Sequence, residues 1–134
     1  MGIKVQKNAI DIGIIAKNID AMLTFYGEGL GLELEATIPM PGGGTMNRFK
    51  VGDSIVKVIE LDPAAAAEAP PGGIRGATGY RYWTIHTPHL GEVVRKIEND
   101  GYKIVVPVKT IREGVAIAIV ADPDGNWVEL LENS

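Results

Sequence analysis

The hydrophobic positions of the chain follow two spacings, one typical of strands and one typical of helices. Residues 9–16, AIDIGIIA, are almost entirely apolar and predict a buried strand. Across residues 19–29 the apolar positions recur every three or four residues, and Asn18 or Asp20 can cap the start, so this segment predicts a helix. Three more strands, of which the last two form a hairpin, are predicted at 32–38, 45–51 and 54–61.

The same order of elements returns in the second half of the chain. Residues 62–79 are rich in Ala, Pro and Gly and show no periodicity, which indicates a linker or a flap. After them we expect, in order, a strand, a helix and three strands at 80–87, 89–101, 102–108, 115–122 and 127–132. The chain therefore repeats the order β-α-β-β-β, and an internal repeat of this kind constrains the architecture.

We expect an α+β fold built from two tandem βαβββ modules within a single domain, residues 1–134. The first module covers about 9–61 and the second about 80–132, with the linker 62–79 between them.

Composition narrows the range of functions. A chain of 134 residues is long enough to bury a real core, and its net charge of −4 argues against nucleic-acid binding. The sequence has no cysteine, which excludes disulfides, thiolate catalysis and zinc–thiolate sites. It contains no apolar run that could span a bilayer and no apolar signal-peptide segment at its start, so we expect a cytoplasmic protein without a membrane partner.

An alignment of the two predicted modules places four polar side chains at two pairs of equivalent positions. Asp11 in the first strand corresponds to Tyr82, and the pair Glu60-Leu61 corresponds to Glu129-Leu130. Glu60 follows Asp11 by 49 positions, and Glu129 follows Tyr82 by 47. Asp11 stands in an otherwise apolar strand, where a carboxylate is costly unless a cation or a hydrogen-bond donor meets it.

Two motifs near the ends of the chain resemble those of the vicinal oxygen chelate (VOC) superfamily. This superfamily includes glyoxalase I, methylmalonyl-CoA epimerase, extradiol dioxygenases, and the fosfomycin and bleomycin resistance proteins. Residues 25–32, FYGEGLGL, are similar to its FY-x-x-x-LG signature, and residues 121–132, ADPDGNWVELLE, are similar to its DP-x-G-x-x-x-E-L ending. The resemblance covers essentially the whole chain and implies that each sheet curls into a half-barrel that lines a cleft.

In that superfamily a metal ion is held in the cleft by one residue from the first strand and one from the last strand of each module. The resemblance therefore implies four ligands in this chain, namely Asp11, Glu60, Tyr82 and Glu129. The usual residues at the positions of Asp11 and Tyr82 are His, Gln or Glu and then His, so this chain departs from the pattern twice. An all-oxygen set excludes the two-histidine iron(II) site of the dioxygenases and favours magnesium, manganese or another hard divalent ion.

A metal-free pocket is the open alternative. Three carboxylates that converge in one cleft repel one another, so at least one must gain a proton, meet a cation or bind a metal ion. Asp11 could instead pair with Arg48 or accept a hydrogen bond from Tyr82.

Two functions from different classes follow from the resemblance. The first is a metal-assisted lyase or isomerase of the glyoxalase type, which stabilises the enolate of a small vicinal-oxygen substrate. Glu129 or Glu60 would be its general base, and His86, on the same strand face as Tyr82, is a further candidate. The second is a ligand-sequestering protein of the bleomycin-resistance type, which needs no metal ion.

Several other residues are candidate contacts for the small-molecule ligand. Arg48 could bind an anionic group, because a guanidinium pairs well with carboxylate and phosphate. Phe49 could line the mouth of an apolar pocket, and Trp83 is either a core residue or a ligand contact. Tyr82 could form a hydrogen bond with the ligand instead of binding a metal ion. The resemblance also implies a homodimer.

Overall fold

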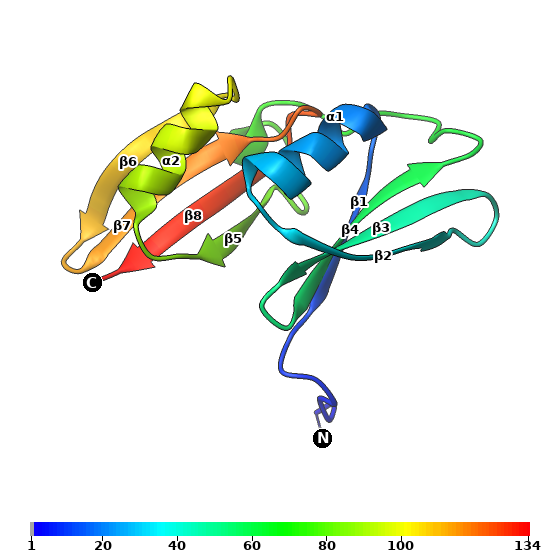
Figure 1. The fold of residues 1–134 in the computed structure, drawn as a ribbon, viewed down its shortest axis with the longest axis horizontal. Helices are drawn as coiled ribbons and strands as arrows, with labels where there is room; N and C mark the ends of the chain where they lie inside the picture. The colour runs from blue at the N-terminus through cyan, green and yellow to red at the C-terminus, as the bar shows by residue number, and fades with distance from the viewer. Residues whose placement is uncertain (1) are drawn as a thin grey trace. The chain divides into compact units, whose positions relative to one another are not determined.

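The computed structural model describes residues 2–134 and divides the chain into two compact units (Figure 1). One unit ends at Ala66 and the other begins at Ala67, so the boundary lies inside the predicted linker. Each unit contains one four-stranded sheet and one main helix, as the predicted repeat requires. Within the described residues, no helix has the length and apolar character needed to cross a membrane.

The first unit follows the predicted order of elements. Its strands are β1 (Asp11–Ile15), β2 (Glu33–Pro39), β3 (Gly44–Val51) and β4 (Ser54–Leu61). The predicted helix over 19–29 is confirmed in extent, but it divides into an α-helix, α1 (Ile19–Thr24), and a π-helical turn, η1 (Phe25–Gly29). In the sheet the order is β1-β4-β3-β2, with β1 parallel to β4 and the other pairs antiparallel.

The second unit repeats this arrangement. It contains β5 (Tyr82–His86), α2 (Leu90–Asn99), β6 (Ile104–Arg112), β7 (Val115–Ala121) and β8 (Trp127–Asn133). The strand order is β5-β8-β7-β6, and β5 runs parallel to β8. One short 3₁₀ turn, η2 (Gly73–Arg75), lies within the segment predicted as a linker or flap.

Each sheet has one face covered by the helix of its own unit, which we call the helix-covered face. The opposite face, which that helix does not cover, is called the open face, although some of its residues, such as Ile55 and Ile119, are buried. In the first unit Phe25 and Tyr26 are fully buried, and the ring of Tyr26 lies 6.3 Å from that of Phe49, between centroids. Alternation along β4 places Val56 and Val58, both buried, on the same helix-covered face as Phe49. The burial of these apolar side chains is the main stabilising term of the unit.

Candidate functional site

The first strand of each unit begins with a residue that the resemblance assigns to a metal site. Asp11 begins β1 and pairs with Ile55 of β4, while Tyr82 begins β5 and pairs with Trp127 of β8. Both pairs stand at the start of a parallel ladder in the same kind of sheet. The predicted equivalence of Asp11 and Tyr82 is therefore confirmed.

Lys57 occupies in the first unit the position that Glu129 holds in the second. Two residues along the first ladder, Gly13 pairs with Lys57, and two residues along the second, Thr84 pairs with Glu129. Directly paired residues project to the same face of a sheet, so Lys57 shares the open face with Asp11. The repeat thus places an ammonium group where its second copy has a carboxylate.

Glu60 is instead the equivalent of Glu132. The ladder hydrogen bond from Ala16 N–H ends on the carbonyl of Ile59, just before Glu60, and the bond from Thr87 N–H ends on the carbonyl of Leu131, just before Glu132. Because side chains alternate along a strand, Glu60 projects from the face opposite to that of Asp11 and Lys57.

This register contradicts the predicted convergence of Asp11 and Glu60. Glu60 lies five positions beyond Ile55, the ladder partner of Asp11, as well as on the other face of the sheet. The two EL pairs of the sequence are not equivalent in the fold.

Glu132, which projects from the helix-covered face, caps the N-terminus of α2. Its two carboxylate oxygens accept hydrogen bonds from the backbone N–H groups of His89 and Leu90, each at 3.1 Å. These groups lie at the N-terminus of α2, where His89 has a left-handed φ of 57° and its own side chain makes no capping bond. A carboxylate from the neighbouring strand therefore caps the helix and also complements its dipole. Sequence reasoning missed this role, and its one signal is the lack of a Ser, Thr, Asp or Asn cap before Leu90.

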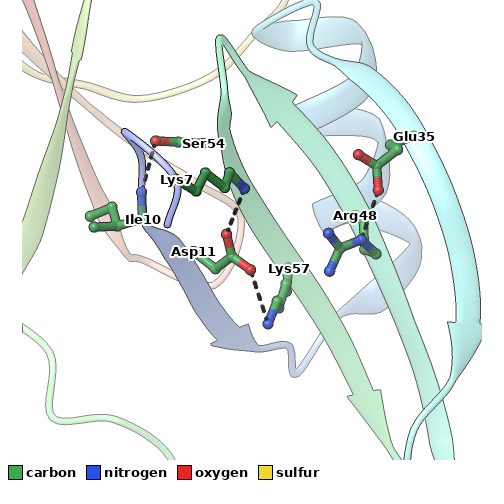
Figure 2. A network of polar contacts seen from close by, with 7 residues as sticks. All are labelled: Lys7, Ile10, Asp11, Glu35, Arg48, Ser54 and Lys57. Atoms are coloured by element: carbon green, nitrogen blue, oxygen red, sulfur yellow. Dashed lines mark hydrogen bonds and ion pairs between the residues drawn. The ribbon is translucent and has the colours of Figure 1, made fainter. Parts of the chain in front are cut away.

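Asp11 is partly exposed and meets two lysines (Figure 2). Lys7 Nζ lies 3.2 Å from Oδ1 and Lys57 Nζ lies 3.4 Å from Oδ2, with 34% of the Asp11 side chain exposed. Desolvation opposes ionisation of this carboxyl, but the hydrogen bonds and charges of the two lysines outweigh it and lower the pKa of Asp11. The predicted partners, Arg48 and Tyr82, are thus replaced by Lys7 and Lys57.

Arg48, on β3, pairs with a carboxylate of the neighbouring strand β2, on its side away from Lys57. Its Nε donates to Glu35 Oε1 at 2.8 Å, and Glu35 stands at an irregularity of β2 between Leu34 and Ala36 (Figure 2). The hydrogen bond from Arg48 is the main cause that lowers the pKa of Glu35, and the same bond raises the pKa of Arg48. Because Arg48 is the direct ladder partner of Lys57, the open face carries the sequence of charges Asp11, Lys57, Arg48, Glu35 across its four strands.

The open face of the second unit is mainly apolar around one oriented carboxylate. Thr84 Oγ1 donates a hydrogen bond of 2.7 Å to Glu129 Oε1, and both residues are half-buried. Glu129 stands between Trp127 and Leu131 along this face of β8, and these two side chains pack against a buried cluster on β7 formed by Val115, Ile117 and Ile119. The predicted location of His86 on the same strand face as Tyr82 agrees with the alternation of β5, and both side chains are exposed.

Two aromatic residues predicted as ligand contacts lie on helix-covered faces. Phe49 is only 2% exposed and packs near Tyr26, so it belongs to the core of the first unit. Trp83 pairs with the fully buried Val128 and therefore projects to the side of the sheet away from Tyr82 and Thr84. Neither ring projects from the open face of its own sheet. Side chains alternate along a strand, and each of these residues falls on a helix-covered position.

The predicted flap packs, in part, on the open face of the second unit. Arg81 Nε donates to the carbonyl of Gly73 at 2.6 Å, and its Nη2 donates to the carbonyls of Pro70 at 2.8 Å and Pro71 at 3.3 Å. Gly73 lies against the indole of Trp127. Arg81 therefore holds residues 70–73 in place while Gly73 packs on Trp127, a role that sequence reasoning did not assign.

A family model described as the Glyoxalase/Bleomycin resistance protein/Dioxygenase superfamily matches residues 10–130. The chain belongs to this superfamily. The protein YwbC of Bacillus subtilis (strain 168) is 26% identical over 122 residues, which are 90% of this chain and 93% of YwbC.

Solved structures of the superfamily share the fold. A glyoxalase family protein from Bacillus cereus matches with a TM-score of 0.82 and 16% identity, over 97% of this chain and 95% of that one. A glyoxalase/bleomycin resistance protein from Streptomyces sp. CB03234 matches with a TM-score of 0.68 and 19% identity, over 95% and 99% of the two chains.

The residues present do not fit the metal ion that superfamily membership implies. In the first unit the carboxylate of Asp11 already meets two ammonium groups, and one of these, Lys57, holds the position equivalent to Glu129. A divalent ion needs unprotonated oxygen or nitrogen ligands, and a neighbouring ammonium repels it. Among residues 2–134, no three His, Asp or Glu residues gather in a way that could hold a metal ion.

Proposed function

We propose that this protein binds a small organic molecule without a bound metal ion, as the bleomycin-resistance type of the superfamily does. One observation carries the proposal: Lys57 stands at the repeat position of Glu129, with its ammonium 3.4 Å from Asp11. The positive charge that a metal ion would supply at this position is already provided by a side chain.

The open face of the second unit supplies features that such a ligand needs. In the second unit, the partly buried side chains of Trp127 and Leu131 lie on either side of Glu129, and Gly73 covers part of the Trp127 indole. Binding sites for small molecules combine apolar walls with a few well-placed polar groups. We infer a ligand with a flat apolar part and at least one polar group.

A second candidate is a metal-free enzyme that moves a proton. Thr84 holds Glu129 with a 2.7 Å hydrogen bond on a largely apolar face, which is a suitable arrangement for a general base. This candidate keeps the isomerase or lyase chemistry predicted from the sequence but assigns no step to a metal ion. The predicted homodimer and the predicted cytoplasmic location stay predictions.

Metal content decides between the proposal and the metal-assisted enzyme. The chain would be incubated separately with magnesium, manganese, nickel and zinc, dialysed, and analysed by elemental mass spectrometry. We expect far less than one ion per chain with each metal, and the same for Glu129→Gln and for the exposed control Glu113→Gln. A near-stoichiometric ion that Glu129→Gln removes and Glu113→Gln retains would contradict the proposal.

A further inference from the structure

We propose that Lys57 and Arg48 form an anion-binding site on the open face of the first unit, and that the ligand carries a carboxylate or a similar small oxyanion. The inference rests on the proposed function and names the class of molecule that is bound.

The two cations are direct neighbours in the sheet. Lys57 and Arg48 are ladder partners on the antiparallel strands β4 and β3 and project to the same face. Like charges at directly opposite positions repel each other. Each cation has a carboxylate on its outer side, Asp11 for Lys57 and Glu35 for Arg48. The two carboxylates therefore offset part of this repulsion, and both lie on the outer sides of the pair.

Arg48 keeps its terminal nitrogens directed toward the centre of the pair. Its bond to Glu35 uses Nε, and Figure 2 shows the two Nη atoms on the side away from Glu35, toward Lys57. A guanidinium can bind a carboxylate through two parallel N–H groups, which gives these nitrogens a natural partner.

The pair is partly withdrawn from water and held in place. The side chains of Lys57 and Arg48 are 26% and 23% exposed, and the two flanking carboxylates fix their heads. Partial burial weakens solvent screening, and fixed side chains lose less entropy when a ligand binds. These are the properties of a recognition site rather than of freely solvated lysines and arginines.

The flanking acids also limit the ligand. Glu35 lies at one end of the charge row, so a polyanion that extends past Arg48 would meet negative charge there; at the other end Asp11 is paired with both Lys57 and Lys7. A single carboxylate or phosphate group would contact Lys57 and Arg48 on the sides of their heads that face away from Asp11 and Glu35. We therefore infer a small organic anion with one charged group.

The test is an NMR titration of the full ¹⁵N-labelled chain with benzoate, with its neutral analogue benzamide and with inorganic phosphate. Benzoate is expected to shift amides of β3 and β4 around positions 48 and 57, with a Kd at least about fivefold lower than that of benzamide, since one charge-assisted hydrogen bond accounts for such a ratio.

Three variants make the assignment specific. Lys57→Met removes the charge but keeps an unbranched side chain, and it is expected to abolish the preference for benzoate. Lys57→Arg keeps the charge and is expected to retain it. The matched control Lys96→Met removes a lysine that pairs with Asp100 at 2.8 Å in the second unit, and it is expected to leave benzoate binding unchanged.

The possible outcomes separate this inference from the proposed function. Equal affinity for benzoate and benzamide, or a preference that survives in Lys57→Met, would overturn the anion site and leave metal-free ligand binding intact. No shift in β3 or β4 with any of the three probes would also overturn it. Phosphate that shifts the same amides as benzoate would support the site and show that the oxyanion alone suffices. Metal content, measured separately, decides the proposed function.

Discussion

Gly73 lies so close to the indole ring of Trp127 that a Cβ added at Gly73 would overlap the ring. Gly73 also has a left-handed φ of 55°, which glycine adopts at little cost. Trp127 stands on the open face of β8, two residues before Glu129. The segment that the sequence predicts as a linker or flap is therefore anchored on a candidate binding face.

Gly73→Ala is expected to destabilise the second unit and to displace this segment. The new methyl group must overlap the indole, and overpacking of this kind costs about 1–3 kcal/mol in addition to the left-handed backbone. The control Gly52→Ala has a similar φ of 58° but open space around its Cβ, so it reports the backbone cost alone. Thermal unfolding followed by circular dichroism should show a lower Tm for Gly73→Ala than for Gly52→Ala. Equal Tm values would contradict the close packing on Trp127.

Arg81→Ala is expected to release residues 70–76. The substitution removes three hydrogen bonds to the carbonyls of Pro70, Pro71 and Gly73. Arg75 lies within the released segment, so limited digestion with trypsin should cut after Arg75 faster than in the unmodified chain. Arg95→Ala, an exposed position on α2, serves as the control. Mass spectrometry of the early fragments measures the rates, and identical rates in the three chains would show that Arg81 does not hold the segment.

Glu132 and Glu60 occupy equivalent positions of the repeat. Glu132 accepts hydrogen bonds from two backbone N–H groups of α2, whereas Glu60 is exposed. Glu132→Ala should lower the free energy of unfolding by about 1–2 kcal/mol, the loss typical of hydrogen bonds to a partly exposed charged cap. Glu60→Ala should change it by less than about 0.5 kcal/mol, as exposed substitutions usually do. Unfolding in urea measures both. A larger loss for Glu60→Ala would argue against the repeat register.

The repeat was predictable from the sequence because it rests on local periodicity, and the same periodicity places Met22 and Tyr26, both fully buried, on the apolar face of the first helix. Register was not. The pairs Glu60-Leu61 and Glu129-Leu130 look equivalent in the sequence, but the ladder partners of β1 and β5 make Lys57 the match for Glu129. Hydrogen bonding between distant strands decides which residues of a strand are equivalent, and no local pattern records it.

The partners of Asp11 were missed for a related reason. Lys7 precedes β1 in a segment without periodicity, and Lys57 lies on a strand 46 positions away. Sequence reasoning assigned Glu60 of that strand to the site of Asp11 and named Arg48 as the candidate cation, so it did not consider Lys57, which the register places beside Asp11. Close pairs formed across strands depend on register in the same way as the repeat positions do.

The lowered pKa of Asp11 gives a pH-dependent prediction. A carboxyl whose pKa is lower in the folded chain than in the unfolded chain contributes stability above its unfolded pKa of about 3.9, and this contribution is lost as the pH falls through the folded value. Lys57→Met removes one of the two ammonium groups that favour the charged form. It should therefore raise the pKa of Asp11 and move the loss of its contribution to higher pH.

This shift can be measured directly at the carboxyl carbon. A ¹³C NMR titration from about pH 2 to pH 6 should give Asp11 a pKa below the ordinary value in the unmodified chain and a higher one in Lys57→Met. Lys96→Met, which removes a lysine from an ion pair of the second unit, should leave it unchanged. If Asp11 titrates identically in all three chains, Lys57 does not neutralise this carboxylate in solution. The Asp11–Lys57 contact on which the metal-free function depends would then have to be abandoned.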